Sequence, residues 1–282
     1  MKKVLMIILV YELFVFSTPV FSQAIDLKPV CPKILGIAHV AYYSDNFEIE
    51  KQFYGSGLGF ANYPSRINKN GVEDMIKYKV GNKQSIELFI EKKAEDRRFY
   101  HYAVFVSDSE LMRQYLASKE LKVPKDTIRN FQNYFAYDYN NMICEMIDIR
   151  KYGSADKETQ PAGIAYHIDC VGFVVPNMQN ALMFYIDLLG CKEISRTTDK
   201  NILKVKLQLQ DSPDTIELTE YQQKNEMPDY GYFDYYSMLT FSVDKAINQL
   251  KSNNIKVNIP GNSNIKKIEL NDINGTRIQM HK

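Results

Sequence analysis

The sequence predicts an α+β protein made of four βαβββ modules, paired into two curved, half-barrel-like sheets with helices on the outside. Residues 34–60, ILGIAHVAYYSDNFEIEKQFYGSGLGF, join an apolar β run, a polar hinge and a helix-like segment that ends in a glycine-broken turn. The same phrase returns later, because residues 170–191 match residues 39–60 without a gap when aligned on their Phe-Tyr pairs. The chain is therefore an internal repeat, and each curved module needs a partner to bury its apolar face.

The first two modules follow the same order of elements. The first runs over about residues 34–92, with a strand that carries His39, a helix from Asn46, and alternating apolar segments at 75–80 and 85–90 around a Gly81-Asn82 turn. The second begins at Phe99 with a strand, continues with a helix over 108–119, and ends in strands joined by an Asn-Asn turn. Both segments predict the same βαβββ unit.

The third and fourth modules follow a polar stretch at 153–163, GSADKETQPAG, which has the composition of a linker. The third module contains a helix that starts at Pro176-Asn177 and strands at 203–210 and 215–221. The fourth runs over 236–282 and ends in a hairpin at Asn274-Gly275. We therefore expect two domains, at 34–152 and 164–282.

The amino terminus has the pattern of a secretory signal peptide. Residues 1–22 contain two lysines, an apolar run broken only by Glu12, and small residues at the exit, followed by an extended lead-in at 23–33. We expect cleavage of 1–22 and an extracytoplasmic mature protein, without membrane attachment after cleavage. The alternative is an interfacial anchor helix that is retained. Cys31 lacks the small residues that a lipoprotein cleavage box would place before it.

Composition argues against two classes of partner. Lys+Arg number 35 and Asp+Glu 34, for a net charge of +1, and no block of like charge is present in the sequence. Nucleic acid and acidic membranes are therefore not expected as partners. The four cysteines show neither C-x-x-C nor zinc-finger spacing, and we interpret them as small buried hydrophobic residues.

The repeated phrases resemble the vicinal oxygen chelate superfamily of glyoxalases, bleomycin resistance proteins and extradiol dioxygenases. The resemblance covers residues 34–280 and rests on HVAYY-SDN, FYGSGLGF, YHYAVFVSD, CVGFVVPN, FYIDLLG and the strand endings SIELFI, MICEMID and TIELTE. It implies that each module offers one metal ligand from its first strand and one from its last. In the first half these positions are His39, Glu87, His101 and Glu145; in the second half they are Cys170, Glu217, Ser237 and Gln279.

The residue types agree with one divalent metal ion in the first half and a degenerate second half. Strand alternation predicts that His39 shares a face with Ile37, Ala41 and Tyr43, and His101 with Phe99, Ala103 and Phe105, while Glu145 lies among Ile143, Ile147 and Ile149. Imidazoles and carboxylates on apolar faces need a partner, and zinc, nickel, cobalt, manganese or iron would supply one. Glu91 is a rival to Glu87, His167 would need a bulge to replace the missing histidine of module three, and His281 is expected to be exposed.

Three functions fit such a site. The first is a metal-dependent lyase or isomerase, monomeric or homodimeric, acting on a small hydroxy- or keto-carbonyl or sugar-like substrate that chelates through neighbouring oxygens. The resemblance to glyoxalases assigns the base to Glu145, whose apolar face suggests a raised pKa. The second is an extradiol-type dioxygenase, disfavoured because that group keeps its metal in the second half. The third is a non-catalytic binding or resistance protein.

The pairing of the modules decides whether these ligands meet. Consecutive pairing, one with two and three with four, would place His39, Glu87, His101 and Glu145 within about 5 Å, given ligand bonds of roughly 2.0 to 2.2 Å. Crossed pairing would split the set and leave neither site complete. The distribution of ligands favours consecutive pairing and makes the second half a scaffold.

Overall fold

The computed structural model of the chain describes residues 29–81, 83–90, 99–125, 132–150, 163–223, 233–260 and 267–282. The expected signal peptide at 1–22, Glu91 and all but Gly163 of the expected linker lie outside these ranges. Within them, no helix is long and apolar enough to cross a bilayer.

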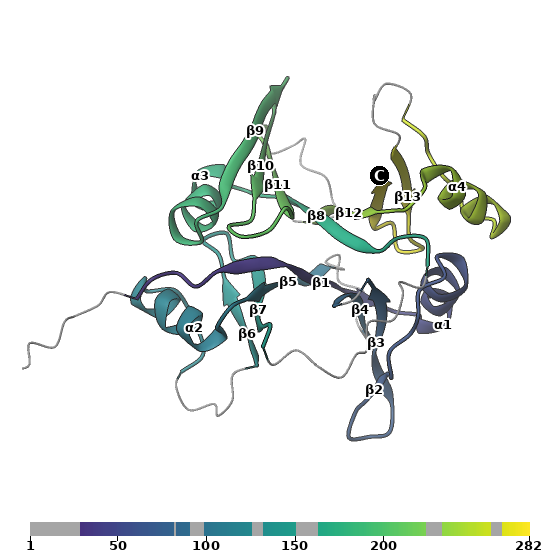
Figure 1. Ribbon diagram of the computed structural model, residues 1–282, viewed down its shortest axis with the longest axis horizontal. Coiled ribbons are helices and arrows are strands. Elements are labelled where there is room, and N and C mark those ends of the chain that lie inside the picture. Colours follow the sequence, from purple (N-terminus) through teal and green to yellow (C-terminus); the bar gives the residue numbers. More distant parts are fainter. Residues whose placement is uncertain are drawn as a thin grey trace, which may run out of the picture.

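Two seven-stranded mixed sheets form the molecule (Figure 1). The first has the order β2-β3-β4-β1-β5-β7-β6 and the second the order β13-β14-β12-β8-β11-β10-β9. The first sheet contains β1 (Ile34–Ser44), β2 (Arg66–Ile67), β3 (Glu73–Val80), β4 (Gln84–Ile90), β5 (Phe99–Val106), β6 (Asn133–Tyr137) and β7 (Ile143–Asp148). The second contains β8 (His167–Val174), β9 (Lys192–Asp199), β10 (Ile202–Gln208), β11 (Thr215–Tyr221), β12 (Phe233–Leu239), β13 (Lys267–Asn271) and β14 (Arg277–His281).

The α+β class and the consecutive pairing of modules are confirmed by this topology. Modules one and two share the first sheet, where β1 runs antiparallel to β5, and modules three and four share the second, where β8 runs antiparallel to β12. In modules two and four the described residues form two strands after the helix. A bridge between Asn258 and Glu269 adds a further pairing in module four.

The helices begin where the sequence places cap residues. They are α1 (Phe47–Glu50), α2 (Ser109–Ser118), α3 (Met178–Leu182) and α4 (Val243–Ser252), and π-helical segments Lys51–Gly57 and Met183–Leu188 continue α1 and α3. The side chains of Asn46, Asp108, Asn177 and Ser242 accept hydrogen bonds from the first-turn amides. In Figure 1, α2 and α3 lie at one end of the sheets, and α1 and α4 at the other.

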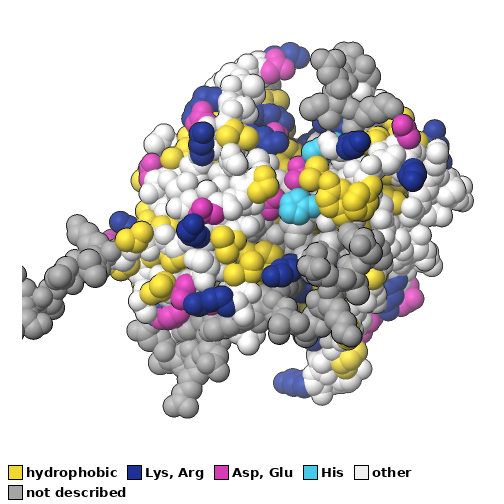
Figure 2. All heavy atoms as spheres, viewed as in Figure 1, with side chains coloured by type: hydrophobic (Ala, Val, Ile, Leu, Met, Phe, Trp, Pro, Cys, Tyr) yellow, Lys and Arg dark blue, Asp and Glu magenta, His cyan; other side chains and the backbone are white. Residues whose placement is uncertain are grey.

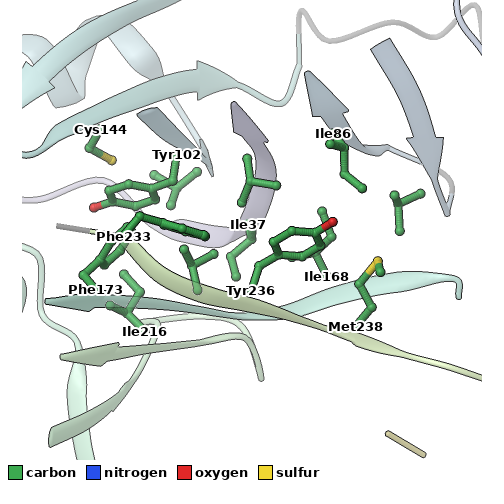
Figure 3. Packing of buried hydrophobic residues seen from close by; sticks show 14 of the residues in the cluster. Ile37, Ile86, Tyr102, Cys144, Ile168, Phe173, Ile216, Phe233, Tyr236 and Met238 are labelled. Carbon is green, nitrogen blue, oxygen red and sulfur yellow. The ribbon is translucent and has the colours of Figure 1, made fainter. Parts of the chain in front are cut away.

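The sheets pack against each other through their central strands. Figure 3 shows Tyr102 from the first sheet close to Phe173 and Phe233 from the second, and Ile37 close to Tyr236. The rings of Phe99 and Phe233 stack at 4.6 Å, and Cys144, Cys170 and Cys191 are buried as expected. Burial of so many large apolar side chains makes this interface the main core of both halves.

A bulge in each of the paired central strands removes one residue from the predicted face of each histidine, while Ala103 and Phe105 stay on the side predicted for His101. Ile37 pairs with Val104 and His39 with Ala103, so Ala38 is an extra residue in β1; Tyr100 is the corresponding extra residue in β5. Ile37 and Phe99 therefore face the core between the sheets, not the histidine side. The predicted face of Glu145 is borne out, because Ile147 and Ile149 pack on the same side.

Candidate metal centre

Three of the four predicted ligands meet on the concave face of the first sheet. The Nε2 atoms of His39 and His101 are 2.8 Å apart, and each lies 3.0 Å from Oε2 of Glu145. All three side chains are buried. They form a group of two imidazoles and one carboxylate whose ligand atoms converge on one point.

The spacing of these atoms tests whether a metal ion fits. With ligand bonds of roughly 2.1 Å, atoms at adjacent corners of an octahedron lie about 3.0 Å apart, and those of a tetrahedron about 3.4 Å. The observed 2.8 to 3.0 Å matches the octahedral arrangement. Because Oε1 of Glu145 also accepts a hydrogen bond from Nδ2 of Asn133, the carboxylate is fixed with Oε2 toward the imidazoles.

Glu87 lies beside this group rather than in it. Its Oε1 is 3.6 Å from Nδ1 of His39, the nitrogen that faces away from His101, and 2.9 Å from Nζ of Lys77. A metal-bound histidine commonly directs its other ring nitrogen at a carboxylate, which fixes the orientation of the ring. Glu87 is the carboxylate on that side of His39, but at 3.6 Å it forms no hydrogen bond, and neither Nδ1 of His39 nor Nδ1 of His101 has a hydrogen-bond partner among the described residues.

Electrostatics keeps the carboxylates ionised and His101 neutral. Burial acts to raise the pKa of Glu145, but its contacts with His101 and His39 outweigh this and hold the pKa well below its usual range. The expectation of a raised pKa for Glu145 is therefore wrong, because it considered the apolar face without the two imidazoles. Burial lowers the pKa of His101, which favours the neutral form that a metal requires.

The candidate ligands line a cavity of about 390 Å³, a size suited to a small molecule. Aromatic side chains surround His101, whose ring centroid lies 4.4 Å from that of Tyr100 and 5.0 Å from that of Phe135. Arg66 lies over the ring of Phe89 at 5.3 Å and pairs with Asp74. The sequence did not single out these lining residues, although Lys77 lies directly opposite Glu87 in the register of β3 and β4.

The second sheet carries different side chains at the same positions. The strand registers show which positions of the two sheets correspond. Ala41 pairs with Glu87 in the first sheet, and Gly172 pairs with Glu217 in the second. Likewise, Ala103 pairs with Glu145, and Ser237 pairs with Gln279. The counterpart of His39 is therefore Cys170, as predicted, but the counterpart of His101 is Tyr235 and not Ser237. The signal was present in the sequence: Tyr235 and Gln279 are 44 residues apart, as are His101 and Glu145.

Two of these counterparts contact each other, and the other two bind residues outside the set. Sγ of Cys170 lies 3.6 Å from the hydroxyl of Tyr235, Lys204 pairs with Glu217, and Gln279 donates to Glu269. Asp169 accepts hydrogen bonds from Ser237 and from His281, so His281 is half-buried rather than exposed. His167 pairs with Asp214 and does not replace a missing ligand. 

On the face of the molecule in Figure 2, basic and acidic side chains are interspersed among apolar and uncharged ones.

A superfamily model and several solved structures are similar to this chain, and they support the fold described above. Residues 167–279 match the model of the Glyoxalase/Bleomycin resistance protein/Dioxygenase superfamily, and no curated protein matches the sequence. The structure is similar to the 2,3-dioxygenase LapB from Pseudomonas sp. KL28, with a TM-score of 0.63, 15% identity, and coverage of 89% of this chain and 93% of that one.

Two further dioxygenases have the same fold. Homoprotocatechuate 2,3-dioxygenase from Brevibacterium fuscum, in complex with 3,4-dihydroxyphenylacetate, gives a TM-score of 0.63 at 14% identity over 90% of this chain and 83% of that one. The halotolerant catechol dioxygenase BphC gives 0.64 at 10% identity over 88% and 87%. At these identities the likeness concerns the fold alone.

Proposed function

We propose that the chain is a double-length member of the glyoxalase, bleomycin resistance protein and dioxygenase superfamily, whose model matches residues 167–279. In this proposal it is an enzyme with one divalent metal ion on His39, His101 and Glu145. Its substrate is a small molecule that chelates the ion through two neighbouring oxygens. The observation that supports this most is the mutual spacing of 2.8 to 3.0 Å among the three ligand atoms, which suits adjacent corners of one coordination sphere.

The other polar residues hold the ligands in place. Asn133 binds the second oxygen of Glu145, and Glu87, itself paired with Lys77, faces the second nitrogen of His39. In this proposal Glu87 orients His39 instead of acting as the fourth ligand. The aromatic side chains Tyr100 and Phe135 exclude water from one side of His101. A divalent ion bound here would polarise a carbonyl or hydroxyl oxygen of the substrate.

The first candidate reaction is that of a lyase or isomerase acting on a hydroxy- or keto-carbonyl or sugar-like compound. Glu145 is the proposed base, because it is ionised and its Oε2, once released from the ion, would still lie beside the ligand atoms of His39 and His101. It would take a proton from the carbon next to a carbonyl and return it to a neighbouring atom. Its low pKa makes it a weak base, so the substrate proton must be strongly acidified by chelation.

The second candidate is an extradiol-type ring-cleaving dioxygenase. Two histidines and one carboxylate on adjacent corners form the ligand set typical of non-haem iron(II) oxygenases, and the structural neighbours are dioxygenases. The aromatic lining of the cavity suits a planar substrate. The location of the three ligands in the first half remains the argument against this candidate.

Two measurements test the proposal. Elemental analysis of purified protein should find one divalent metal per chain, and its absence would disprove the metal-dependent function. The protein loaded with iron(II) is then given 3,4-dihydroxyphenylacetate in an oxygen electrode, and the protein loaded with other divalent ions is given a simple hydroxyketone in D₂O. Oxygen uptake identifies a dioxygenase, deuterium at carbon identifies a lyase or isomerase, and saturable binding without either identifies a binding protein.

We further propose export, with removal of residues 1–22, on the order of charged, apolar and small residues at the amino terminus. Amino-terminal sequencing of protein from its native host should begin near residue 23. Detection of Met1 or Lys2 at the amino terminus would contradict it.

A further inference from the structure

The bulge in β1 lies where the two sheets touch. Figure 3 shows Ile37 of β1 and Ile168 of β8 in the core between the sheets, and each precedes an extra residue in its strand. In β1 the extra residue is Ala38, and in β8 it is Asp169. Because successive side chains in a strand alternate, the bulge allows Ile37 to face the core and His39 to face the cavity.

Two buried side chains bind the backbone at this bulge. The amide of Ile37 donates to Oδ2 of Asp214 at 2.8 Å, and Nε2 of Gln84 donates to the carbonyl of Ile37 at 2.9 Å. Gln84 is 5% exposed and Asp214 2% exposed, so these hydrogen bonds are shielded from water. Asp214 belongs to the second half of the chain, and it therefore acts on β1 from across the interface.

The same side chains bind the bulge of β8. Oε1 of Gln84 accepts from the amide of Ile168 at 2.6 Å, and its Nε2 also donates to the carbonyl of Ile168 at 2.8 Å. Oδ1 of Asp214 lies 2.6 Å from Nε2 of His167. Gly36 has φ +142°, and a Cβ atom there would lie 2.9 Å from Oδ2 of Asp214, so this position needs glycine for the close approach.

We propose that Gln84 and Asp214 are positioning residues for the metal centre, which fix the bulge that directs His39 into the cavity. The inference rests on the proposed function for its consequence, since His39 is a ligand there. Loss of the bulge would restore strict alternation and place Ile37 and His39 on the same face, so that both could not keep their present positions in the core and in the cavity. The second half thus contributes to the metal centre through the backbone of β1, although it lacks the ligand set itself.

The test compares two interface hydrogen-bond variants of the full chain. Gln84→Met keeps the side-chain volume and removes the hydrogen bonds of Gln84 to Ile37 and Ile168, while the bond from the Ile37 amide to Asp214 remains. Tyr54→Phe is the matched control, because the Tyr54 hydroxyl also crosses the interface, to Asp272, without contacting the bulge of β1. We expect Gln84→Met to raise the Kd for Co²⁺ by about 10- to 100-fold, as observed for groups that orient metal ligands, and to alter the visible spectrum of the bound ion. Tyr54→Phe should leave both unchanged.

Equal effects of the two variants on Co²⁺ binding would overturn the inference, because they would show only a general loss of stability. If Gln84→Met does not fold, Asp214 gives the same comparison. Asp214→Asn keeps an acceptor for the amide of Ile37 and should retain wild-type affinity, whereas Asp214→Ala should not. An equal affinity in these two variants would also overturn the proposal.

A measurement without metal separates this inference from the proposed function. The imidazole signals of His39 in ¹⁵N-labelled, metal-free protein should move in Gln84→Met and in Asp214→Ala, and remain in place in Tyr54→Phe. If wild-type protein binds no Co²⁺, the proposed function fails, while these signals still decide whether Gln84 and Asp214 position His39. Unchanged His39 signals in both variants would refute the positioning role.

Discussion

The two sheets have corresponding strand orders and bulges at corresponding positions, but they differ in what lies on the concave face. In the first sheet, His39, His101 and Glu145 bring three ligand atoms within 2.8 to 3.0 Å of one another. In the second, the counterparts Cys170 and Tyr235 contact each other across a hydrogen bond of 3.6 Å. The backbone therefore supplies two similar frameworks, and the side chains at a few register positions decide which of them can hold a metal ion.

The histidines of the two sheets show the same contrast in their charge. Burial lowers the pKa of His101, which keeps it neutral and able to coordinate a metal. The hydrogen bond to Asp169 raises the pKa of His281, which favours its charged, paired form. In the first sheet the neutral imidazole of His101 lines a cavity that a ligand could enter. In the second sheet His281 and Asp169 form a hydrogen bond with each other.

The largest expected effect is the loss of the metal from the first sheet. His39→Ala removes one of three ligands, so the metal content should fall from one ion per chain to nearly none. Cys170→Ala, the matching change in the second sheet, should retain one ion per chain. Elemental analysis of both variants checks this, and retention of the ion in His39→Ala would contradict the assignment of the site.

The next test attempts to build the first site in the second sheet. Cys170→His, Tyr235→His and Gln279→Glu together place two imidazoles and a carboxylate at the corresponding register positions. We expect a second Co²⁺ ion per chain, bound about 10- to 100-fold more weakly than the first because groups that orient the new ligands are lacking. Titration by calorimetry measures both affinities. A stoichiometry that stays at one would show that register alone does not define the site.

A smaller effect should separate the two glutamates Glu87 and Glu217. Glu87→Gln replaces the carboxylate that faces Nδ1 of His39 with an uncharged amide. We expect the Kd for Co²⁺ to rise by roughly 10- to 100-fold, with little change in the visible spectrum. Glu217→Gln should have no effect on binding. If Glu87→Gln instead abolishes binding and Glu145→Gln does no more, Glu87 is the fourth ligand.

The smallest effect concerns pH. Because the folded-state pKa of His281 is raised, its pairing with Asp169 stabilises the fold below about pH 6.5, the unfolded value of histidine, and the contribution is lost as pH rises through the folded value. Asp169→Asn should therefore destabilise the protein more at pH 5.5 than at pH 8.5. Urea unfolding at both pH values measures this, and NMR titration of metal-free protein should place the pKa of His281 above that of His101. An equal loss of stability at the two pH values would refute it.

The class of fold and most helix starts could be predicted from local patterns in the sequence. The glycine-broken turns, the cap residues Asn46, Asp108 and Asn177, and the alternating strands are local signals, and local structure follows from them. The three residues of the candidate metal centre could also be predicted, because His39, His101 and Glu145 are residue types that an apolar strand does not accommodate without a partner.

The residues that share a face with each histidine, the place of Glu87 and the counterpart of His101 depend on contacts between segments that are distant in the sequence. Alternation predicted that Ile37 and His39 share a face, but a bulge is set by contacts between strands and by side chains such as Gln84 and Asp214, which come from distant positions in the sequence. For the same reason the pKa of Glu145 is lowered rather than raised: its apolar neighbours are local, while the imidazoles that outweigh them arrive from other strands.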